Sequence, residues 1–376
     1  MVHTLRKKFF HETIENHAHS MTFPIYQTGS FQMPEGEHYR YSRELNPTVE
    51  ELSRIISIFE SSEATTCTSS GMGAISTTLL SLLRPEKKLI IPYDLFGRTY
   101  NFAKDFLREW KVNTIISEIG TDQVISHIEH GAIVFLETVS NPMLTVYDIE
   151  KISKTVHEHN GILVVDSTLP TPFNINPLQL GADVVIHSLS KFMSGHNDLI
   201  GGSISGSKVL IDKIDSFRRT LGTSMDPNTA FLAIRGLKTL GIRMENINSH
   251  ALSVSMMLSN SGNFKNIRYP LNPSHPDYRL STRILYGGSG IVTFDLSNES
   301  CSPEKFMRRL NLAKPANTFG GVNSTVSHPW TMSHRSISTE DRKRLGITER
   351  TIRLSVGTEE PEDIVKDIIL ASTEEK

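Results

Sequence analysis

The chain of 376 residues has little cysteine: its two thiols, Cys67 and Cys301, lie far apart in the sequence. Two isolated cysteines exclude a disulfide-rich scaffold, and they give none of the ligand spacings that mark a zinc site. We therefore predict that the protein holds no metal. This cysteine usage fits a reducing compartment such as the cytoplasm.

An excess of charge of either sign is also missing. The 39 basic and 41 acidic residues leave a net charge of -2, so the composition lacks the basic surface that binds nucleic acid or anionic membranes. No apolar run approaches membrane-spanning length, and the basic start "MVHTLRKKFF" is followed by polar residues rather than by the apolar core of a signal peptide. We expect a cytoplasmic protein that binds small molecules, with neither nucleic acid nor membrane as a partner.

What the sequence does contain is an alternation of short β-rich runs with amphipathic segments. The runs span residues 87–92, 113–117, 132–137, 161–166 and 182–188, and the segments between them span residues 70–83, 98–110 and 148–160. This order predicts a doubly wound α/β domain from about residue 44 to 240, with ligands at the carboxyl ends of its parallel strands. Two later runs, 288–297 and 349–357, predict strands of a second α/β layer.

Lys191 follows the run 182–188 and precedes a glycine-rich turn. A lysine taken alone is usually a surface residue, but Asp166 ends the preceding run, so both side chains are expected at the same edge of the sheet. A buried carboxylate needs a cationic partner. A pyridinium nitrogen is such a partner, and a lysine amine can hold the same ring as a Schiff base. The pair therefore predicts a site for pyridoxal 5'-phosphate (PLP).

The phosphate of that cofactor needs a site of its own, and "TSSGMGAI" (68–75) supplies one. Glycines and small residues at a predicted helix start expose the backbone N–H groups of Gly71 and Met72, where the helix dipole favours an anion. Ser188 and Ser190 add hydroxyl donors. Such a segment alone is an ordinary helix start, and its occurrence together with the lysine and the aspartate favours the cofactor site.

Two other glycine-rich signals carry little weight. "GGSISGSK" (201–208) nearly forms a phosphate-binding loop, but Ser207 precedes Lys208, the reverse of the order that a nucleotide triphosphate site requires. No G-x-G-x-x-G follows the first predicted strand, so a nicotinamide site lacks its fingerprint.

Eight collinear segments resemble the cysteine/methionine-metabolism family of PLP enzymes, which includes cystathionine γ-synthase, cystathionine γ-lyase and methionine γ-lyase. They are "FPIYQTGSF" (23–31), "YSRELNPT" (41–48), "SSGM" (69–72), "ETVSNP" (137–142), "VVDST" (164–168), "GADVVIHSLSKFMSGHNDLIGG" (181–202), "FGGVNSTVSHPWTMSH" (319–334) and "RLSVGTEEPED" (353–363). The resemblance implies an α/β fold of the aspartate-aminotransferase type (fold type I) with a mainly parallel sheet. It also implies an N-terminal arm (1–43) that completes the neighbouring active site, a PLP-binding domain (44–240) and a C-terminal domain (241–376) that binds the substrate carboxylate.

By this resemblance, Lys191 is the catalytic residue that carries the cofactor, Asp166 pairs with the pyridine nitrogen, and Asn141 contacts the ring hydroxyl. The phosphate is held by Gly71, Met72, Ser188 and Ser190, while Tyr41 and Arg43 reach the phosphate in the neighbouring subunit. Shared sites imply a homo-oligomer, a dimer at least and a tetramer as is usual in the family.

For the amino-acid substrate, the resemblance implies that Arg353 binds the α-carboxylate through a bidentate fork. Thr318 and Ser324 lie in the same carboxylate-binding segment. Asn323 stands where many relatives have a glutamate that meets the distal ammonium of cystathionine, so this chain lacks the ionic partner for that end.

Two further departures concern the cofactor face. Phe96 replaces the family's stacking tyrosine, which keeps the aromatic ring but loses the phenol, so any role of that hydroxyl is absent or moved, for example to Tyr93 or Tyr100. Arg98 stands where relatives commonly carry a small residue or a cysteine, which makes the pocket more cationic.

The implied activity is elimination or replacement at the γ-carbon of sulfur amino acids, of the cystathionine γ-lyase or γ-synthase type. Methionine γ-lyase and O-acylhomoserine sulfhydrylase activities stay open, because both fates share one intermediate. A catalytically silent PLP-fold binding protein is the remote alternative. Phe96 and Asn323 motivate it, whereas the intact Lys191, Asp166 and Arg353 oppose it.

Overall fold

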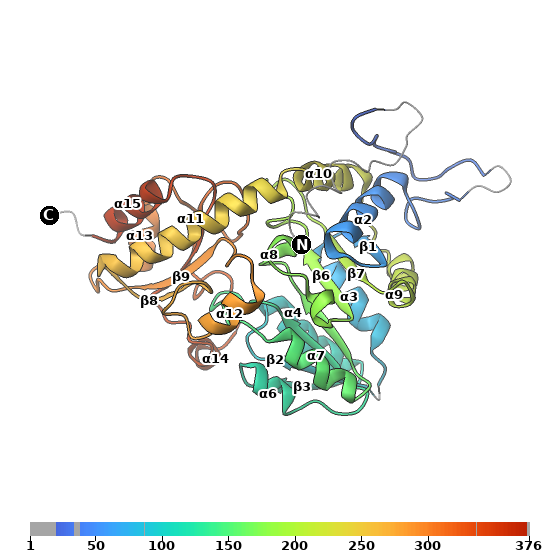
Figure 1. Cartoon of the computed structure of the whole chain (residues 1–376), viewed down its shortest axis with the longest axis horizontal. Helices are drawn as coiled ribbons and strands as arrows, with labels where there is room; N and C mark the ends of the chain where they lie inside the picture. The colour runs from blue at the N-terminus through green and yellow to red at the C-terminus, as the bar shows by residue number, and fades with distance from the viewer. Residues whose placement is uncertain (1–19, 34–37, 86, 336, 374–376) are drawn as a thin grey trace.

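The computed structural model describes residues 20–33, 38–85, 87–335 and 337–373. Figure 1 shows two α/β parts side by side, a larger one built mainly from blue to green segments and a smaller one built from orange to red segments. Residues 1–19 and 34–37 of the predicted N-terminal arm lie outside the described residues. The predicted domain boundaries at residues 43 and 240 stay predictions.

Seven strands form the larger sheet, in the order β1-β7-β6-β5-β4-β2-β3. They are β1 (Ala64–Thr68), β2 (Lys88–Pro92), β3 (Asn113–Ser117), β4 (Ile133–Glu137), β5 (Ile162–Asp166), β6 (Val184–Ser188) and β7 (Gly202–Gly206). The pairs from β3 across to β6 are parallel, whereas β7 is antiparallel to both β1 and β6. The predicted fold class, an α/β protein with a mainly parallel sheet, is confirmed.

Helices cover both faces of this sheet because successive strand residues point to opposite sides. Val164 packs in one buried cluster with Leu79 of α3, and Val165 packs in another cluster with Ile152 of α7. The helical segments of this part are α2 (Pro47–Glu60), α3 (Gly71–Leu82), α4 (Gly97–Asn101), the π-helical turn η1 (Phe102–Phe106), α5 (Leu107–Glu109), α6 (Thr121–Ile125), α7 (Ile149–Glu158), α8 (Thr171–Asn174), the 3-10 turn η2 (Pro177–Leu180), α9 (Lys208–Leu221) and α10 (Pro227–Leu237).

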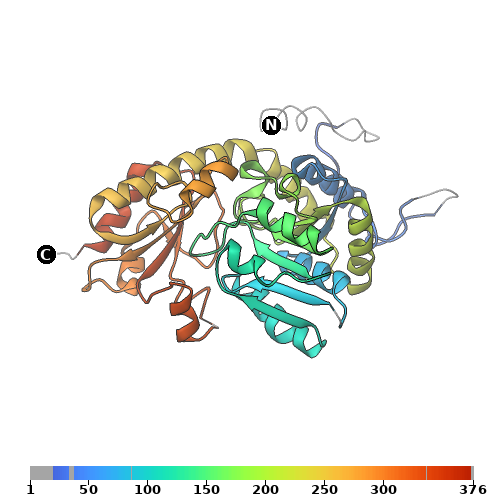
Figure 2. The same ribbon diagram turned by 60° about the horizontal axis from the view of Figure 1, so that its bottom comes forward.

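The smaller sheet has the order β10-β11-β12-β9-β8, and the long helix α11 lies against it. Its strands are β8 (Phe264–Arg268), β9 (Ile291–Leu296), β10 (Lys314–Pro315), β11 (Thr325–Ser327) and β12 (Thr351–Ser355), and its helices are α11 (Leu240–Ser261), α12 (Tyr278–Ile284), α13 (Pro303–Arg309), α14 (Thr339–Arg344) and α15 (Pro361–Ser372). In Figures 1 and 2, α11 runs from the larger part along the full length of the smaller one. One continuous helix therefore connects the two sheets.

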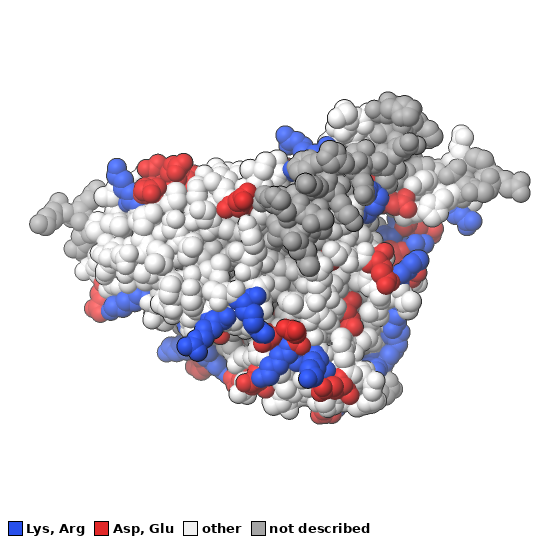
Figure 3. All heavy atoms as spheres, viewed as in Figure 1, with Lys and Arg blue, Asp and Glu red and all other residues white. Residues whose placement is uncertain are grey.

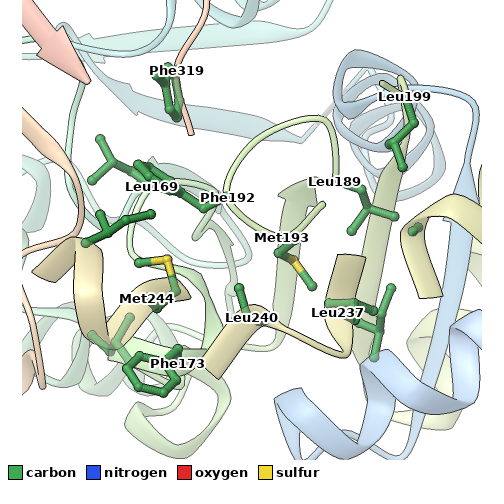
Figure 4. Packing of buried hydrophobic residues seen from close by; sticks show 14 of the residues in the cluster. Leu169, Phe173, Leu189, Phe192, Met193, Leu199, Leu237, Leu240, Met244 and Phe319 are labelled. Atoms are coloured by element: carbon green, nitrogen blue, oxygen red, sulfur yellow. The ribbon is translucent and has the colours of Figure 1, made fainter. Parts of the chain in front are cut away.

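A buried apolar cluster ties the two parts together next to Lys191. Figure 4 shows Leu169 and Phe192 of the larger part close to Phe319, which comes from the segment before β11. The rings of Phe192 and Phe319 have their centroids 5.8 Å apart. Because Phe192 is fully buried directly after Lys191, this packing places the lysine beside the segment that carries Phe319.

The surface carries charges of both signs. On the face drawn in Figure 3, lysines and arginines are interspersed with aspartates and glutamates. Within the described ranges, no helix is both long enough and apolar enough to cross a membrane.

Candidate active site

A cavity of about 800 Å³ lies at the carboxyl ends of β4, β5 and β6. Residues 317–319, 331–333 and 335 of the smaller part also line it. Ten residues with a predicted role line it: Gly71, Met72, Phe96, Asn141, Asp166, Ser188, Ser190, Lys191, Thr318 and Arg353. The fold therefore brings together, in one cavity, residues that are separated by up to 282 positions in the sequence.

Lys191 is held in the turn that follows β6. Its Nζ donates a hydrogen bond to Thr318 Oγ1 at 3.1 Å and lies 4.8 Å from the centre of the Phe319 ring. Burial, helped by the positive charge of Arg353, lowers the pKa of Lys191 from 10.5 to about 8. A substantial fraction of the amine is therefore neutral near physiological pH, as a nucleophile or a proton acceptor requires.

Two carboxylates stand next to each other at the sheet edge, because Glu137 and Asp166 are paired in register at the ends of β4 and β5. Burial raises the pKa of Asp166, while hydrogen bonds from Thr168 oppose that rise, including one from its backbone N–H to Oδ1 at 2.9 Å. Burial and then the charge of Asp166 raise the pKa of Glu137 well above its usual range. Such a pair is stabilised by a cation in the cavity.

The first turn of α3 forms an anion cradle. The Ser70 side chain caps the helix by accepting from Gly73 N–H at 2.9 Å, and the N–H groups of Gly71 and Met72 in that turn have no intrahelical acceptor. A Cβ atom at Gly71 would lie only 2.8 Å from Ser188 Cβ. The absence of that side chain lets the helix end approach the Ser188 hydroxyl closely, so both line one concave surface suited to a phosphate.

Ser190 belongs to the same wall of the cavity. Its Oγ accepts a hydrogen bond from Gly201 N–H at 3.1 Å. This contact fixes the hydroxyl oxygen and leaves its hydrogen free to be donated to an anion.

Arg353 lies on β12 with only 3% of its surface exposed. Its Nη1 donates to Asn141 Oδ1 at 3.2 Å and its Nη2 donates to the Thr318 carbonyl at 2.9 Å, while its Nε has no acceptor among the residues that the structure describes. Burial lowers the pKa of Arg353 to about 10, so it stays charged at neutral pH. A buried, incompletely paired guanidinium calls for an anionic ligand such as a carboxylate.

Two residues with predicted substrate contacts do not line the cavity. The Ser324 hydroxyl donates to Glu359 Oε2 at 2.8 Å and accepts from Gly357 N–H at 2.9 Å, so it is engaged within the small sheet. Asn323 is exposed and lies outside the lining. Their roles in binding the substrate stay predictions.

Tyr41 and Arg43 also lie away from the cavity of their own chain. Arg43 stacks over the Tyr41 ring at 5.6 Å and donates to the Arg219 carbonyl at 2.5 Å. Both lie between residue 38, where the described residues resume, and the start of α2 at Pro47. Half of the Tyr41 surface is exposed, so this pair is positioned on the outside of the chain.

Phe96 lines the cavity just before α4, and its backbone N–H donates to Glu137 Oε1 at 2.7 Å. The phenols suggested by the sequence as substitutes for a hydroxyl here are elsewhere. Tyr93 and Tyr100 pack edge to face and line a separate small pocket of about 10 Å³ with His334. The main cavity therefore has an aromatic wall at Phe96 without a phenol from either residue.

Sequence reasoning missed two charged residues of the lining, Glu137 and Arg335. Glu137 could have been predicted from the sequence, because it ends the β-rich run 132–137 just as Asp166 ends the run 161–166. Arg335 could not, since it lies in the irregular turn over residues 329–335.

The chemistry of the lining fits PLP. A reactive amine at Lys191, a buried carboxylate at Asp166 and an anion cradle at Gly71 line one cavity, and no cluster of metal-ligating side chains occurs in the described part of the chain. An α/β fold with this set of groups defines a pyridoxal-phosphate-dependent enzyme.

Comparisons with known proteins give the family. The model of the Cys/Met metabolism PLP-dependent enzymes matches residues 8–372, and the chain belongs to this family. It is 34% identical over 355 residues to cystathionine γ-lyase of Bacillus subtilis, covering 93% of each chain. It is 32% identical over 369 residues to L-methionine γ-lyase of Pseudomonas putida, covering 94% of this chain and 93% of that one.

Solved structures agree. The crystal structure of cystathionine γ-synthase from Xanthomonas oryzae pv. oryzae in complex with cystathionine matches with a TM-score of 0.93 at 26% identity, covering 99% of this chain and 97% of that one. The likeness therefore extends over both sheets and not only over the cofactor-binding part.

Proposed function

We propose that this PLP enzyme catalyses elimination or replacement at the γ-carbon of sulfur amino acids and related homoserine derivatives, as cystathionine γ-lyases and γ-synthases do. The observation that carries the proposal is the position of Thr318. Its hydroxyl accepts from Lys191 and its carbonyl accepts from Arg353. A proton-transferring amine and a carboxylate-binding group thus flank one residue, which suits an α-amino acid held by its carboxylate with its α-hydrogen facing the amine.

The cofactor would be held by residues from the larger part. Asp166 would face the ring nitrogen, Asn141 the ring hydroxyl and Phe96 the ring face, and the phosphate would meet Gly71, Met72, Ser188 and Ser190. When bound, PLP supplies the electron sink that makes the α-hydrogen of an amino acid acidic. The N–H and hydroxyl of Thr168 both favour the charged carboxylate of Asp166 and so oppose the rise in its pKa that burial causes.

Proton transfer falls to Lys191. With its pKa lowered to about 8 by burial and by Arg353, the neutral amine would take a proton from the substrate Cα. Once it has released that proton and is neutral again, it would take one from Cβ. Loss of the β-hydrogen allows the bond between Cγ and its sulfur or oxygen substituent to break. Arg353, charged and buried, keeps the α-carboxylate fixed during these steps.

The cavity of about 800 Å³ is the space that the cofactor, the amino acid and a second reactant would share. Water entering the site gives a 2-oxo acid and ammonia, whereas a thiol gives a thioether. The printed activities of the relatives, cystathionine γ-lyase and L-methionine γ-lyase among them, support γ-chemistry. Methionine γ-lyase and O-acylhomoserine sulfhydrylase activities are therefore the alternatives to test.

We further propose a homo-oligomer, a dimer with shared sites assembled into a tetramer, in the cytoplasm. Support for shared sites comes from Tyr41 and Arg43, which lie outside the cavity of their own chain on an exposed segment. Support for a reducing compartment comes from Cys67 and Cys301, which are both buried and unpaired.

The test is a substrate panel on the purified holoenzyme. Cystathionine, methionine, homocysteine and O-acylhomoserines are each assayed for a change in the visible spectrum, for 2-oxobutanoate and, with an added thiol, for thioether. We expect spectral changes with all of them and γ-products with at least one. A holoenzyme whose spectrum is unaltered by every amino acid would instead support the silent binding protein.

A further inference from the structure

The cavity carries more positive charge than the proposed function uses. Its cationic lining residues are Lys191, Arg353, Arg98 and Arg335, and its carboxylates are Glu137 and Asp166. Both carboxylates lie at strand ends and accept hydrogen bonds from the backbone of Phe96 and Thr168. With Lys191 and Arg353 assigned to the amino-acid core of the substrate, Arg98 and Arg335 are left over.

These two arginines come from touching segments at the exposed side of the cavity. Arg98 lies in the first turn of α4 and Arg335 ends the turn over residues 329–335, and both are exposed. The segments meet at Gly97, where an added Cβ would lie 3.8 Å from the Ser333 carbonyl oxygen. Arg98 directly follows Gly97, and Arg335 is two residues after Ser333. The backbones of the two arginines are therefore close together at the cavity rim.

Neither guanidinium is paired with a carboxylate of the described chain, whereas some other exposed arginines are. Arg219 pairs with Asp215 at 2.6 Å and Arg283 with Asp148. Arg98 and Arg335 have no such contact within residues 20–33, 38–85, 87–335 and 337–373. Two cations that come from neighbouring segments of a cavity rim, neither of them paired with a carboxylate of the described chain, attract an anionic ligand.

We propose that Arg98 and Arg335 form a subsite for a carboxylate or phosphate at the far end of a reactant. The preferred reactants are then doubly acidic, with the α-carboxylate at Arg353 and a second acidic group at the rim. This inference rests on the proposed γ-chemistry and specifies its substrate class: homoserine esters whose γ-substituent carries a free acidic group, or an acceptor thiol that carries one.

The chemistry of the leaving group also favours an ester as the substrate. When the Cγ–O bond of such an ester breaks, both of its electrons go to oxygen and the acyl group leaves as a carboxylate. The β-hydrogen goes to the Lys191 amine as a proton, and the electron pair of the Cβ–H bond forms the Cβ–Cγ double bond. A carboxylate is a weak base that leaves without a proton. The Phe96 side chain has no proton to donate to a leaving group. Arg98, two residues further along the chain, provides a permanent positive charge instead. A thiolate leaving group, in contrast, is basic enough to need protonation.

The distal acidic group can belong either to the leaving group of the ester or to the acceptor thiol. Two assays on the holoenzyme distinguish these alternatives. In the first, kcat/KM for elimination is compared between O-succinylhomoserine and O-acetylhomoserine without a thiol, which tests the leaving group. In the second, O-acetylhomoserine is kept constant and cysteine is compared with cysteamine, the same thiol without a carboxylate. The variants are Arg98→Met, Arg335→Met and the double variant, with Arg98→Lys as the charge-conserving change.

We expect the acidic reactant to be preferred in one of the assays. Each single methionine variant should lower that preference by about threefold and the double variant by about tenfold, the size expected of solvent-accessible charge pairs. Arg98→Lys should retain most of it. The matched control, Arg108→Met, removes an exposed arginine of α5 outside the cavity and should leave both ratios unchanged.

A binding measurement keeps this inference separate from the reaction. L-2-aminoadipate and L-norleucine have no γ leaving group and differ in their distal carboxylate, so their Kd values for the holoenzyme report the subsite alone. Preference for 2-aminoadipate that disappears in the double variant supports the subsite even if no ester is turned over, which would refute only the proposed function. Equal preference in the wild type and the double variant, in both assays and in binding, overturns the subsite.

Discussion

The amine of Lys191 donates a hydrogen bond to the hydroxyl of Thr318 across 3.1 Å. Lys191 follows β6 of the larger sheet and Thr318 precedes β11 of the smaller one. The carbonyl of Thr318 also accepts from Arg353 at 2.9 Å. One threonine thus contacts both the amine of Lys191 and the guanidinium of Arg353 across the boundary between the two sheets.

The first prediction concerns this hydroxyl. Thr318→Val removes it but keeps the β-branched shape and the backbone carbonyl. The protonated amine of Lys191 loses an acceptor, so its pKa should fall by about half a unit to one unit, as expected for one hydrogen bond. The pH dependence of PLP uptake by the apoenzyme, followed by absorbance, should move to lower pH. Thr318→Ser keeps a hydroxyl and serves as the control, and a shift in the opposite direction for valine would contradict the bond's role.

The second prediction concerns Lys191 in the unaltered protein. Because its pKa is lowered from 10.5 to about 8, covalent attachment of PLP to the apoenzyme should accelerate as pH rises through about 8 and level off above it. Lys191→Ala should bind PLP only non-covalently and turn over no substrate. Attachment that keeps accelerating toward pH 10.5, or an alanine variant as active as the parent, would show that this lysine is not the reactive one.

The third prediction concerns stability without cofactor. The pKa of Lys191 is lower in the folded chain than in the unfolded one, so the unfolded state binds more protons between pH 8 and 10.5 and the folded state gains stability as pH rises through that interval. Below pH 8 the full penalty of burying the charged amine applies. Lys191→Met should therefore stabilise the apoenzyme at pH 7 by about 1–3 kcal/mol, with less gain at pH 10. Urea unfolding at both pH values measures this, and a methionine variant that is less stable at pH 7 would contradict it.

The strands and the strand-end residues were predictable from the sequence because parallel strands buried on both faces are continuous apolar runs. The run 113–117 coincides with β3, and Asp166 ends β5 as expected. Strands β1 and β7 were missed because "ATTCT" and "GSISG" are weakly apolar. Their burial depends on partners distant in sequence, for instance Thr65 and Ser205, whose hydroxyls lie 2.8 Å apart.

Other differences come from tertiary packing that no local pattern records. The predicted helix over residues 98–110 is divided into α4, a π-helical turn and α5, and the wider turn leaves Phe106 and Trp110 stacked on the outside while Leu107 is buried. In the site, Arg335 contributes from an irregular turn without periodicity. Ser324 belongs to a family motif, yet its hydroxyl is occupied by Glu359.

The fourth prediction separates the two carboxylates. Asp166→Asn removes the charge that we propose to face the ring nitrogen and should weaken PLP binding by about tenfold to a hundredfold, the range for a hydrogen bond to a charged group. Glu137→Gln keeps an acceptor for the Phe96 N–H, now bonded at 2.7 Å, so it should affect PLP binding much less. Equilibrium dialysis of PLP gives both Kd values, and Glu137→Leu tests the Phe96 contact itself. Equal losses in the asparagine and glutamine variants would mean that the ring nitrogen does not distinguish the two groups.

The fifth prediction tests shared sites. Arg43→Ala and Lys191→Ala should each be inactive alone, but mixed chains should recover about a quarter of the parent activity, since half of randomly formed dimers are hybrids with one intact site. Each variant refolded by itself is the control. If mass spectrometry shows that hybrid dimers form but they are inactive, Arg43 contributes to the active site of its own subunit.

Because the two sheets contribute different residues to the cavity, these residues are translated at different times during protein synthesis. A nascent chain that has emerged through β7 already contains all seven strands of the larger sheet, with Gly71, Asp166 and Lys191. Arg353 on β12 is translated much later, after α11. The residues proposed to hold the cofactor are therefore synthesised before Arg353, the residue proposed to hold the amino acid, so a chain still being translated could bind the cofactor before it could bind a substrate.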